Sequence, residues 1–261
     1  MPKILVEQKS KYNWRPDKPD ARDHIFNAAA VAPAQLLPAV DLRQYDSPIQ
    51  DQGQIGSCTG NAIAGLINLI DRKVNNTPLQ VSRLFIYYQE RVYEGTVYYD
   101  SGAYIRDGIK TVYTYGAPTE SLWPYQTRLL YNRPSTAAWT DAAKRKVTGY
   151  QRVQSLNDIK VALSAGNPVV IGFTVYESFE GNANNTTGMM PFPNTGTEQI
   201  LGGHAVAVVG YNDNLNGGRL ICRNSWGTSW GDRGYFYMPY QVITTPGMAS
   251  DFWMISAVHK A

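Results

Sequence analysis

The sequence predicts an α+β fold in which a helical lobe is followed by a β lobe, with a cleft between the two. In the first half, apolar residues recur at helical spacing, so that one stripe facing a core is formed by Ile63, Leu66, Ile67 and Ile70. After residues 122–125 the pattern changes to short apolar segments bounded by Gly, Asn or Pro. With 261 residues and 43% hydrophobic content, the chain can bury a full core.

Residues 1–38 predict an extended arm ahead of the two lobes. They are rich in Pro, Ala and Asp and lack sustained periodicity. Their first apolar run is too short for the core of a signal peptide, and no apolar run in the chain is long enough to span a membrane. We therefore expect an N-terminal extension (1–38), a mainly helical lobe (39–125) and a mainly β lobe (126–261).

Periodicity predicts four helices. The first starts at Cys58, and the others cover residues 81–93, 104–115 and 156–165. Ser57, Ser82 and Asn157 are the expected N-caps, because their short polar side chains can accept a hydrogen bond from a free backbone N–H. Gly116 and Gly166 follow two of the helices, where glycine is the usual residue.

The second lobe predicts a series of strands, namely NPVVIGFTV, AVAVVGY, RLICR, GYFYMPY and FWMISAV. The tract between the first two, residues 180–199, is rich in Asn, Gly and Thr. We expect it to form a long loop beside the cleft.

Cys58 is the first candidate for chemistry. At the start of a helix, unpaired N–H groups and the positive end of the helix dipole favour an anion, which predicts a lowered thiol pKa. Gly53 and Gly56 allow the preceding backbone to turn tightly, so that the Gln52 amide and the Cys58 N–H can form two donors for a developing oxyanion. The alternative is a small buried hydrophobic residue, as free cysteines often are.

His204 is the candidate base. Two glycines precede it and an apolar strand follows, which places the imidazole at the start of a strand on the rim of a lobe. Asn224 comes just after another strand and can orient the ring, while Trp226 and Trp230 can shield that hydrogen bond from water. The alternatives are a core histidine with satisfied hydrogen bonds and an ordinary turn-forming asparagine.

Three motifs resemble those of the papain-like cysteine peptidases: Gln52 six residues before Cys58, GGHAVAVVGY, and RNSWGTSWGDRGYFYM. The resemblance extends from about residue 38 to the C-terminus. It implies the two-lobed papain-like fold, with a helical lobe and an antiparallel β-barrel-like lobe. By the same resemblance Cys58 is the nucleophile, His204 the acid and base, Asn224 the residue that orients the imidazole, and Gln52 the side-chain donor of the oxyanion hole.

The resemblance also implies substrate contacts. Trp226 borders the leaving-group side of the cleft, and the segment SGAYIRDGIK resembles the glycine-rich wall along which a peptide lies, with Ser101 and Gly102 approaching its backbone. Ala103 replaces a glycine often found in that wall. Gly203 stands where some relatives carry Asp, which removes a charge beside the histidine.

One departure from the family concerns the thiols. Ile55 and Thr59 replace the Cys and Trp of the usual C-G-S-C-W, so the usual disulfide is impossible, and Cys222 is expected to be a buried structural thiol.

The arm resembles short N-terminal extensions of bacterial papain-like proteins. We expect residues 1–38 to pack on the body and obstruct the cleft as a short propeptide, the alternative being a tail that only pads the β lobe.

The expected function is a cysteine-type endopeptidase that cleaves peptides or proteins through an acyl-enzyme. The alternatives are a catalytically silent binding protein on the same fold and an acyltransferase with the same thioester chemistry. A serine-hydrolase string, GTSWG, surrounds Ser229, but it leads into a strand where a helix is required.

Composition disfavours several other classes. A net charge of +3, spread along the chain, predicts no nucleic-acid or membrane partner. Two cysteines and three scattered histidines lack zinc spacing, so we expect no metal and no cofactor. We expect a monomer, and the low cysteine content favours a reducing compartment such as the cytoplasm.

Overall fold

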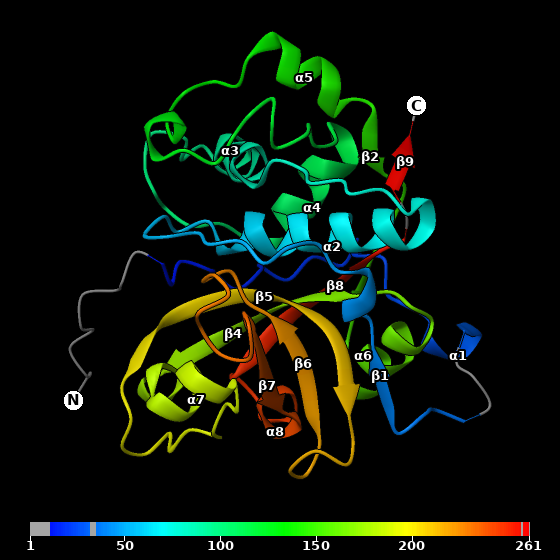
Figure 1. The fold of residues 1–261 in the computed structure, drawn as a ribbon, viewed down its shortest axis with the longest axis vertical. Coiled ribbons are helices and arrows are strands. Elements are labelled where there is room, and N and C mark those ends of the chain that lie inside the picture. Colours follow the sequence, from blue (N-terminus) through cyan, green and yellow to red (C-terminus); the bar gives the residue numbers. More distant parts are fainter. Residues whose placement is uncertain (1–10, 32–34, 257, 261) are drawn as a thin grey trace.

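The computed structural model describes residues 11–31, 35–256 and 258–260. The helices are α1 (Ala28–Val31), α2 (Cys58–Asn75), α3 (Arg83–Tyr93), α4 (Ile105–Thr114), α5 (Thr136–Ala142), α6 (Leu156–Ser164), α7 (Asn182–Thr187) and α8 (Tyr240–Thr244). The strands are β1 (Ala39–Asp41), β2 (Arg145–Val147), β3 (Tyr150–Val153), β4 (Val169–Tyr176), β5 (Ile200–Asn212), β6 (Arg219–Arg223), β7 (Tyr235–Pro239), β8 (Ala249–Ile255) and β9 (Val258–Lys260). Two halves lie one above the other in Figure 1: the helices labelled α2 to α5 lie in the upper half, and the large sheet lies in the lower half together with α1, α6, α7 and α8.

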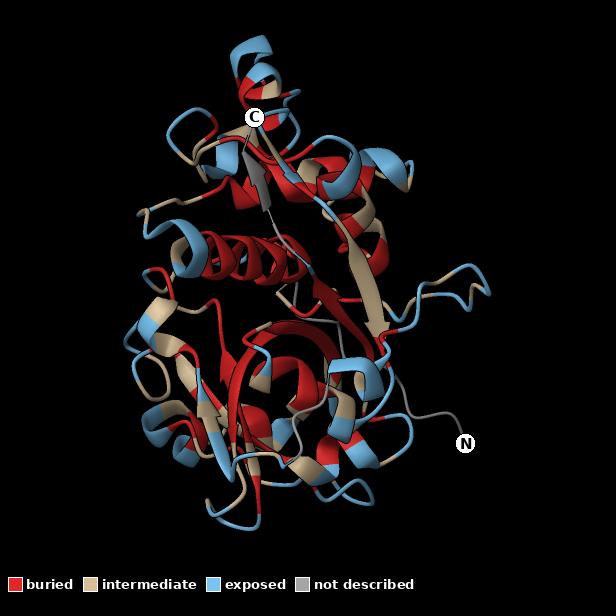
Figure 2. Cartoon of the chain, turned by 90° about the vertical axis from the view of Figure 1, so that its right-hand side faces the viewer, coloured by how far each residue is buried: buried red, intermediate tan, exposed pale blue. Residues whose placement is uncertain are grey.

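Helix α2 is the central element of the molecule. It packs against α3 and α4 on one side and against β5 on the other, so it is buried from Cys58 to Asp71 (Figure 2). A helix in contact with both halves needs apolar residues around most of its surface, which is why Ala, Ile and Leu recur along α2. Its N-terminus therefore opens at the junction between the halves.

The main sheet has seven strands and every pair in it is antiparallel. Its order is β3-β8-β4-β5-β6-β7, and β1 pairs with β5. In this register Phe173 on β4 lies opposite His204, and Arg223 at the end of β6 lies opposite Ala207. Because β6 runs back along β5, Asn224 is returned to the side of His204.

Chain order and spatial order differ in two places. The segment from α5 to β2 follows residue 125 but lies in the helical half, where β2 pairs with β9 from the end of the chain. Strand β1 precedes the helices but pairs with β5 in the main sheet.

The arm runs along the junction of the two halves. Backbone bridges join Asn13 to Gly203, Trp14 to Ala103 and Ile25 to Arg152. Figure 1 shows this segment in dark blue between α2 and the sheet. Its aromatic residues are buried, so the described part of the arm is an integral layer of the fold.

Most helices and strands predicted from the sequence are confirmed, with corrections at their ends. Asn157 is not the N-cap of α6, because Ser155 accepts the hydrogen bond from Asp158 N–H. Ser57 precedes α2 but its hydroxyl does not cap it, since that oxygen hydrogen-bonds Tyr125 Oη at 2.6 Å. The expected loop over 180–199 contains the short helix α7.

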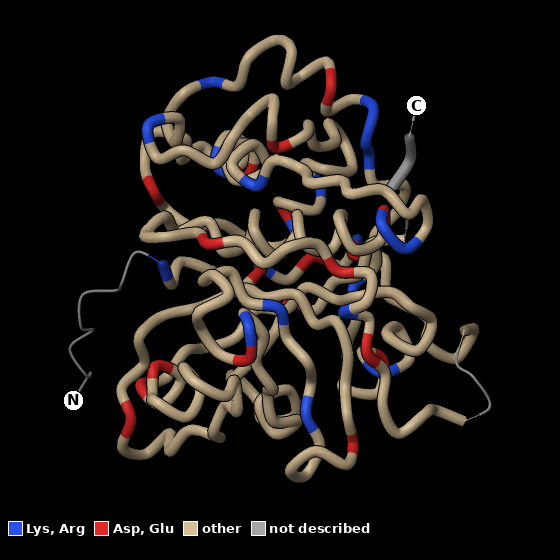
Figure 3. The backbone as a smooth tube through the Cα atoms, in the orientation of Figure 1, with Lys and Arg blue, Asp and Glu red and all other residues tan. Residues whose placement is uncertain are grey.

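The surface and the helices give two further observations. Acidic and basic residues are interspersed over both halves (Figure 3). No helix within the described ranges is both long and apolar enough to cross a membrane.

Candidate active site at the junction of the two halves

Cys58 begins α2, and its side chain is fully buried. The backbone amides of Ala205 and of Asn13 hydrogen-bond with its thiol, so the residue after His204 and the arm both reach the sulfur. Burial raises the pKa of Cys58 to about 12, and Glu90 adds to the rise. The prediction of a lowered pKa is therefore wrong for this arrangement, because loss of water outweighs the helix start.

His204 lies within β5, which begins at Ile200, five residues before the predicted strand AVAVVGY, and its ring is fully buried. Its Nε2 is 2.8 Å from Asn224 Oδ1. Since an amide oxygen only accepts, Nε2 carries the proton and Nδ1 is left as the acceptor. Among the described residues Nδ1 has no hydrogen-bond partner. Burial lowers the pKa of His204 to about 4, so the imidazole is neutral here.

Aromatic rings surround this hydrogen bond. The Trp226 ring lies 5.1 Å from that of His204, and Trp230 packs edge-on to Trp226 at 4.9 Å. Tyr12 from the arm and Phe173 from β4 pack edge-on to the imidazole. These rings exclude water from the His204–Asn224 contact.

Hydrogen bonds hold both the oxygen and the nitrogen of the Gln52 side-chain amide. Its Oε1 accepts a hydrogen bond from Ser225 Oγ at 2.6 Å, and its Nε2 donates to Ile55 O at 2.9 Å. The same Nε2 lies 3.3 Å from the carbonyl oxygen of Lys11 in the arm. Sequence reasoning missed Ser225, whose only signal was its position next to Asn224.

The predicted substrate contacts surround the arm. Gly102 has a left-handed φ of 66°, and a side chain there would collide with the Asn13 carbonyl. Trp14 N–H donates to Gly203 O at 3.0 Å, and Arg15 N–H donates to Ala103 O at 3.2 Å. Ser101 lies one position further out, where its hydroxyl donates to Thr96 Oγ1.

Trp226 completes the surface on which the arm lies. The Tyr12 ring is 5.6 Å from that of Trp226, and the Lys11 ammonium lies over the indole. We call the surface formed by residues 101–103, Gly203 and Trp226 the arm-covered surface.

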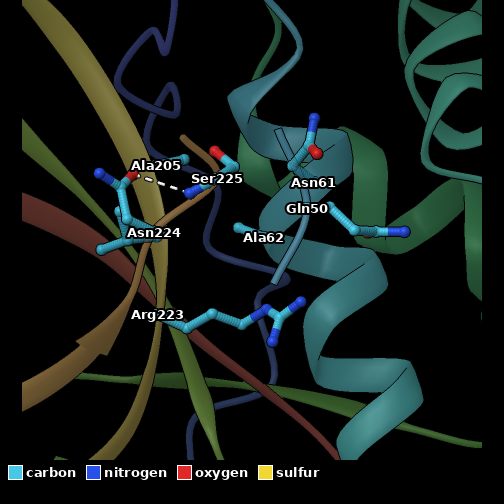
Figure 4. A pocket seen from close by; sticks show the side chains of 8 residues that line it. Gln50, Asn61, Ala62, Ala205, Arg223, Asn224 and Ser225 are labelled. Atoms are coloured by element: carbon cyan, nitrogen blue, oxygen red, sulfur yellow. Dashed lines mark hydrogen bonds between the residues drawn. The ribbon is translucent and has the colours of Figure 1, made fainter. Parts of the chain in front are cut away.

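Behind Asn224 lies a small space of about 10 Å³ between α2 and the sheet (Figure 4). Arg223 extends across this junction and pairs with Asp46 at 2.8 Å, while it donates to Ser47 O and Pro48 O. The space holds at most one water molecule, so it is not a substrate site. The space lies beside the buried Arg223–Asp46 ion pair, which connects the two halves.

Two further observations concern metal-ligating side chains and the second thiol. Within the ranges that the structure describes, no group of three His, Cys, Asp or Glu side chains is arranged to hold a metal ion. Cys222 is a free thiol buried in β6, and burial raises its pKa, which fits the structural role expected for it.

Comparison with known proteins identifies the family. A sequence model described as "Papain family cysteine protease" matches residues 36–255. The chain belongs to the papain family. The protein is thus a cysteine-type hydrolase, and the expected papain-like α+β fold is confirmed.

Individual relatives agree with this assignment. An "Uncharacterized peptidase C1-like protein L477" of Acanthamoeba polyphaga mimivirus is 38% identical, over 95% of this chain and 87% of its own length. The crystal structure of xylellain, a cysteine protease from Xylella fastidiosa, is 40% identical with a TM-score of 0.86, covering 98% of this chain and all of that one. Digestive procathepsin L 3 of Tenebrio molitor, 20% identical with a TM-score of 0.74 over 95% of this chain and 77% of its own, shares the fold.

Proposed function

We propose that the protein is an endopeptidase in which Cys58, His204, Asn224 and Gln52 form one catalytic site. The observation that carries the proposal is the buried hydrogen bond from His204 Nε2 to Asn224 Oδ1, which leaves Nδ1 as the acceptor while the next residue, Ala205, touches the Cys58 thiol. A nucleophile, a base and a third group that orients the base are the parts that acyl transfer requires.

The reaction follows from these positions. His204 Nδ1 takes the thiol proton, and the Cys58 sulfur then attacks the peptide carbonyl. Gln52 Nε2–H and the Cys58 N–H stabilise the oxyanion that forms. The imidazolium protonates the leaving amine as the C–N bond breaks. His204 next takes a proton from water, whose oxygen attacks the thioester, and the released thiol regains its proton.

In this proposal the enzyme is inactive while the arm is docked. The Lys11 carbonyl lies on the Gln52 donor that the oxyanion would use, and the Tyr12 ring covers His204. The described arm buries the thiol and the imidazole together, which raises one pKa and lowers the other and so disfavours the thiolate–imidazolium pair. Release of the arm admits water and restores the pair.

The direction of the arm supports inhibition without cleavage. From Lys11 to Trp14 the chain runs from Trp226 towards Ala103. A substrate must run the other way, because its leaving amine belongs on the Trp226 side. A carbonyl held in the reversed chain does not present its C–N bond to His204 for protonation.

Labelling by an epoxide thiol inhibitor, followed by peptide digestion, tests the proposal. We expect the full chain to be labelled at Cys58 and to cleave peptides internally at the low rate that transient release of the arm allows, and we expect Cys58→Ala to lose both. The matched control is Cys222→Ala, which removes the other buried thiol. Wild-type turnover by Cys58→Ala would contradict the proposal, and a transferred product in the presence of an amine acceptor would indicate acyl transfer.

A further inference from the structure

Tyr125 contacts both ends of the short segment that carries the two proposed donors to the oxyanion. Gln52 supplies its side-chain amide and Cys58 its backbone N–H, so the donors stand at the two ends of residues 52–58. The Tyr125 hydroxyl lies 2.9 Å from the backbone oxygen of Gln52. It also lies 2.6 Å from the hydroxyl of Ser57, the residue immediately before Cys58. One phenol oxygen therefore bridges the segment.

The direction of each hydrogen bond follows from what its partners can do. A carbonyl oxygen only accepts, so the Tyr125 hydroxyl donates its single proton to Gln52 O. Ser57 Oγ then donates to the Tyr125 oxygen, and it accepts in turn from Asn61 Nδ2 at 3.0 Å. The result is a directed chain of hydrogen bonds from α2 to the Gln52 backbone, in which each bond strengthens the next.

The helical half holds the Tyr125 ring in place. The Arg83 guanidinium lies over this ring, 3.9 Å from its centroid, and donates to Asp51 O at 2.8 Å and to Asn61 Oδ1 at 3.0 Å. The Tyr125 N–H donates to Glu120 Oε1, which lies 3.7 Å from Arg83 Nε. Burial raises the pKa of Tyr125 to about 12, so its hydroxyl stays protonated and remains a donor at neutral pH.

The sheet half ties Gln52 in a different direction. Ser225 donates its hydroxyl to the Gln52 amide oxygen, and its carbonyl accepts the Gln52 N–H at 2.8 Å. The Tyr125 bridge instead links Gln52 to the start of α2. Without the phenol oxygen, the buried Ser57 hydroxyl loses its acceptor, and Gln52 O keeps the longer bond from Ile55 N–H at 3.4 Å. Because an unsatisfied buried donor costs free energy, we expect the segment to shift when this oxygen is removed.

We propose that Tyr125 is a positioning residue that sets the distance between the two oxyanion donors, Gln52 Nε2 and the Cys58 N–H. The inference rests on the proposed function and adds a residue to it. Tyr125 acts through these two donors and does not itself contact the reacting atoms. Its effect belongs to the transition state, because the developing oxyanion needs both donors at once.

Tyr125→Phe tests the inference, since it removes the phenol oxygen and keeps the ring under Arg83. All variants are made in the full chain carrying Trp14→Ala, which removes a buried side chain of the arm and so opens the site. Rates on one peptide are divided by the fraction of chains that an epoxide inhibitor labels at Cys58. We expect kcat to fall about 5- to 50-fold with KM changed about twofold or less, because a misplaced donor costs less than a missing one.

Tyr211→Phe is the matched control. The Tyr211 hydroxyl likewise contacts a backbone carbonyl, Leu37 O at 2.7 Å, and a serine hydroxyl, Ser164 Oγ at 3.1 Å. Tyr211 is buried near the end of β5, beyond His204. We expect Tyr211→Phe to change kcat by about twofold or less.

Two further measurements separate positioning from general damage to the site. Spacing between donors matters only while both are present, so adding Tyr125→Phe to Gln52→Ala should lower kcat by a further factor of about two or less. Alkylation of Cys58 by iodoacetamide displaces iodide at a saturated carbon and forms no oxyanion, so Tyr125→Phe should change its rate about twofold or less. If Tyr125→Phe does not fold, Ser57→Ala removes the other end of the bridge and should give the same pattern.

The outcomes distinguish this inference from the proposed function. An unchanged kcat in Tyr125→Phe, an equal loss in Tyr211→Phe, an equal slowing of iodoacetamide alkylation, or a loss of full size in the Gln52→Ala background would overturn the positioning role. A kcat that Gln52→Ala leaves unchanged would remove Gln52 from the proposed site, and this inference with it. Absence of both turnover and Cys58 labelling before Tyr125 is changed would instead refute the catalytic proposal.

Discussion

Trp14→Ala is the perturbation that most directly probes the latent arrangement. Truncating a buried tryptophan costs about 3 to 5 kcal/mol, through lost contacts and the cavity left behind. Part of that cost is offset, because the unpaired Nε1 also disappears and an unsatisfied buried donor costs about 1 kcal/mol or more. The backbone bonds to Gly203 and Ala103 remain available. Arm docking should weaken by about 2 to 4 kcal/mol, which is about 30- to 1000-fold in the ratio of open to closed molecules.

The assay is the rate at which Cys58 is alkylated by an epoxide thiol inhibitor, read by intact mass. Trp139→Ala is the matched control, since that indole packs on Phe85 at 5.0 Å in the helical half, away from the arm. We expect labelling of Trp14→Ala to accelerate by a factor within the stated range and that of Trp139→Ala to change little. An unaccelerated Trp14→Ala protein with an unchanged melting temperature would refute the claim that the arm limits access to the thiol.

Three further predictions concern the site and its pH dependence. Gln52→Ala should lower kcat about 10²-fold with a small change in KM, because its bond forms with the oxyanion; a pure KM effect in steady-state kinetics would contradict this. Asn224→Ala should reduce kcat/KM less than His204→Ala does, since Asn224 orients and does not transfer a proton; equal losses measured on one peptide would argue for a shared structural defect. Burial, with repulsion from Asp251, raises the pKa of Asp17 in the arm to about 6, so the docked arm holds this proton more strongly than a released arm does. Docking should then weaken as pH rises from about 4 to 6 and be about tenfold tighter at pH 5 than at pH 7. The Cys58–His204 pair does not oppose this near neutrality, because its neutral and ion-pair forms carry the same number of protons. Hydrogen exchange of the Trp14 and Arg15 amides measures how tightly the arm docks at each pH, and Asp17→Asn should remove most of the pH dependence. Tighter docking at pH 7 than at pH 5 would contradict the prediction.

The sequence predicted those parts of the fold that depend on local pattern. Periodic apolar residues located α2, and turn residues bounded β4 to β8. The order and local context of Gln52, Cys58, His204 and Asn224 in the sequence also indicate the candidate site. In the structure Asn224 hydrogen-bonds with His204, and the backbone of Ala205 hydrogen-bonds with the Cys58 thiol.

The remainder depends on contacts between distant segments. The path of the arm has no periodicity of its own, since it is fixed by partners such as Gly203 and Ala103 on other elements. Contacts between distant segments also explain the error at Cys58, where a local helix-start argument could not include the complete burial of the thiol, which raises its pKa. Ser225 likewise has a meaning only once its hydroxyl is seen to hold Gln52.

Trapping of the covalent intermediate tests the central claim most directly. A peptide ester is mixed with the Trp14→Ala chain, the reaction is quenched in acid during turnover, and intact and digested masses are measured. Our mechanism predicts a mass increase equal to the acyl group, located on Cys58 and absent from the chain that also carries Cys58→Ala. Turnover with no acyl group on Cys58, or with the group on another residue, would contradict it.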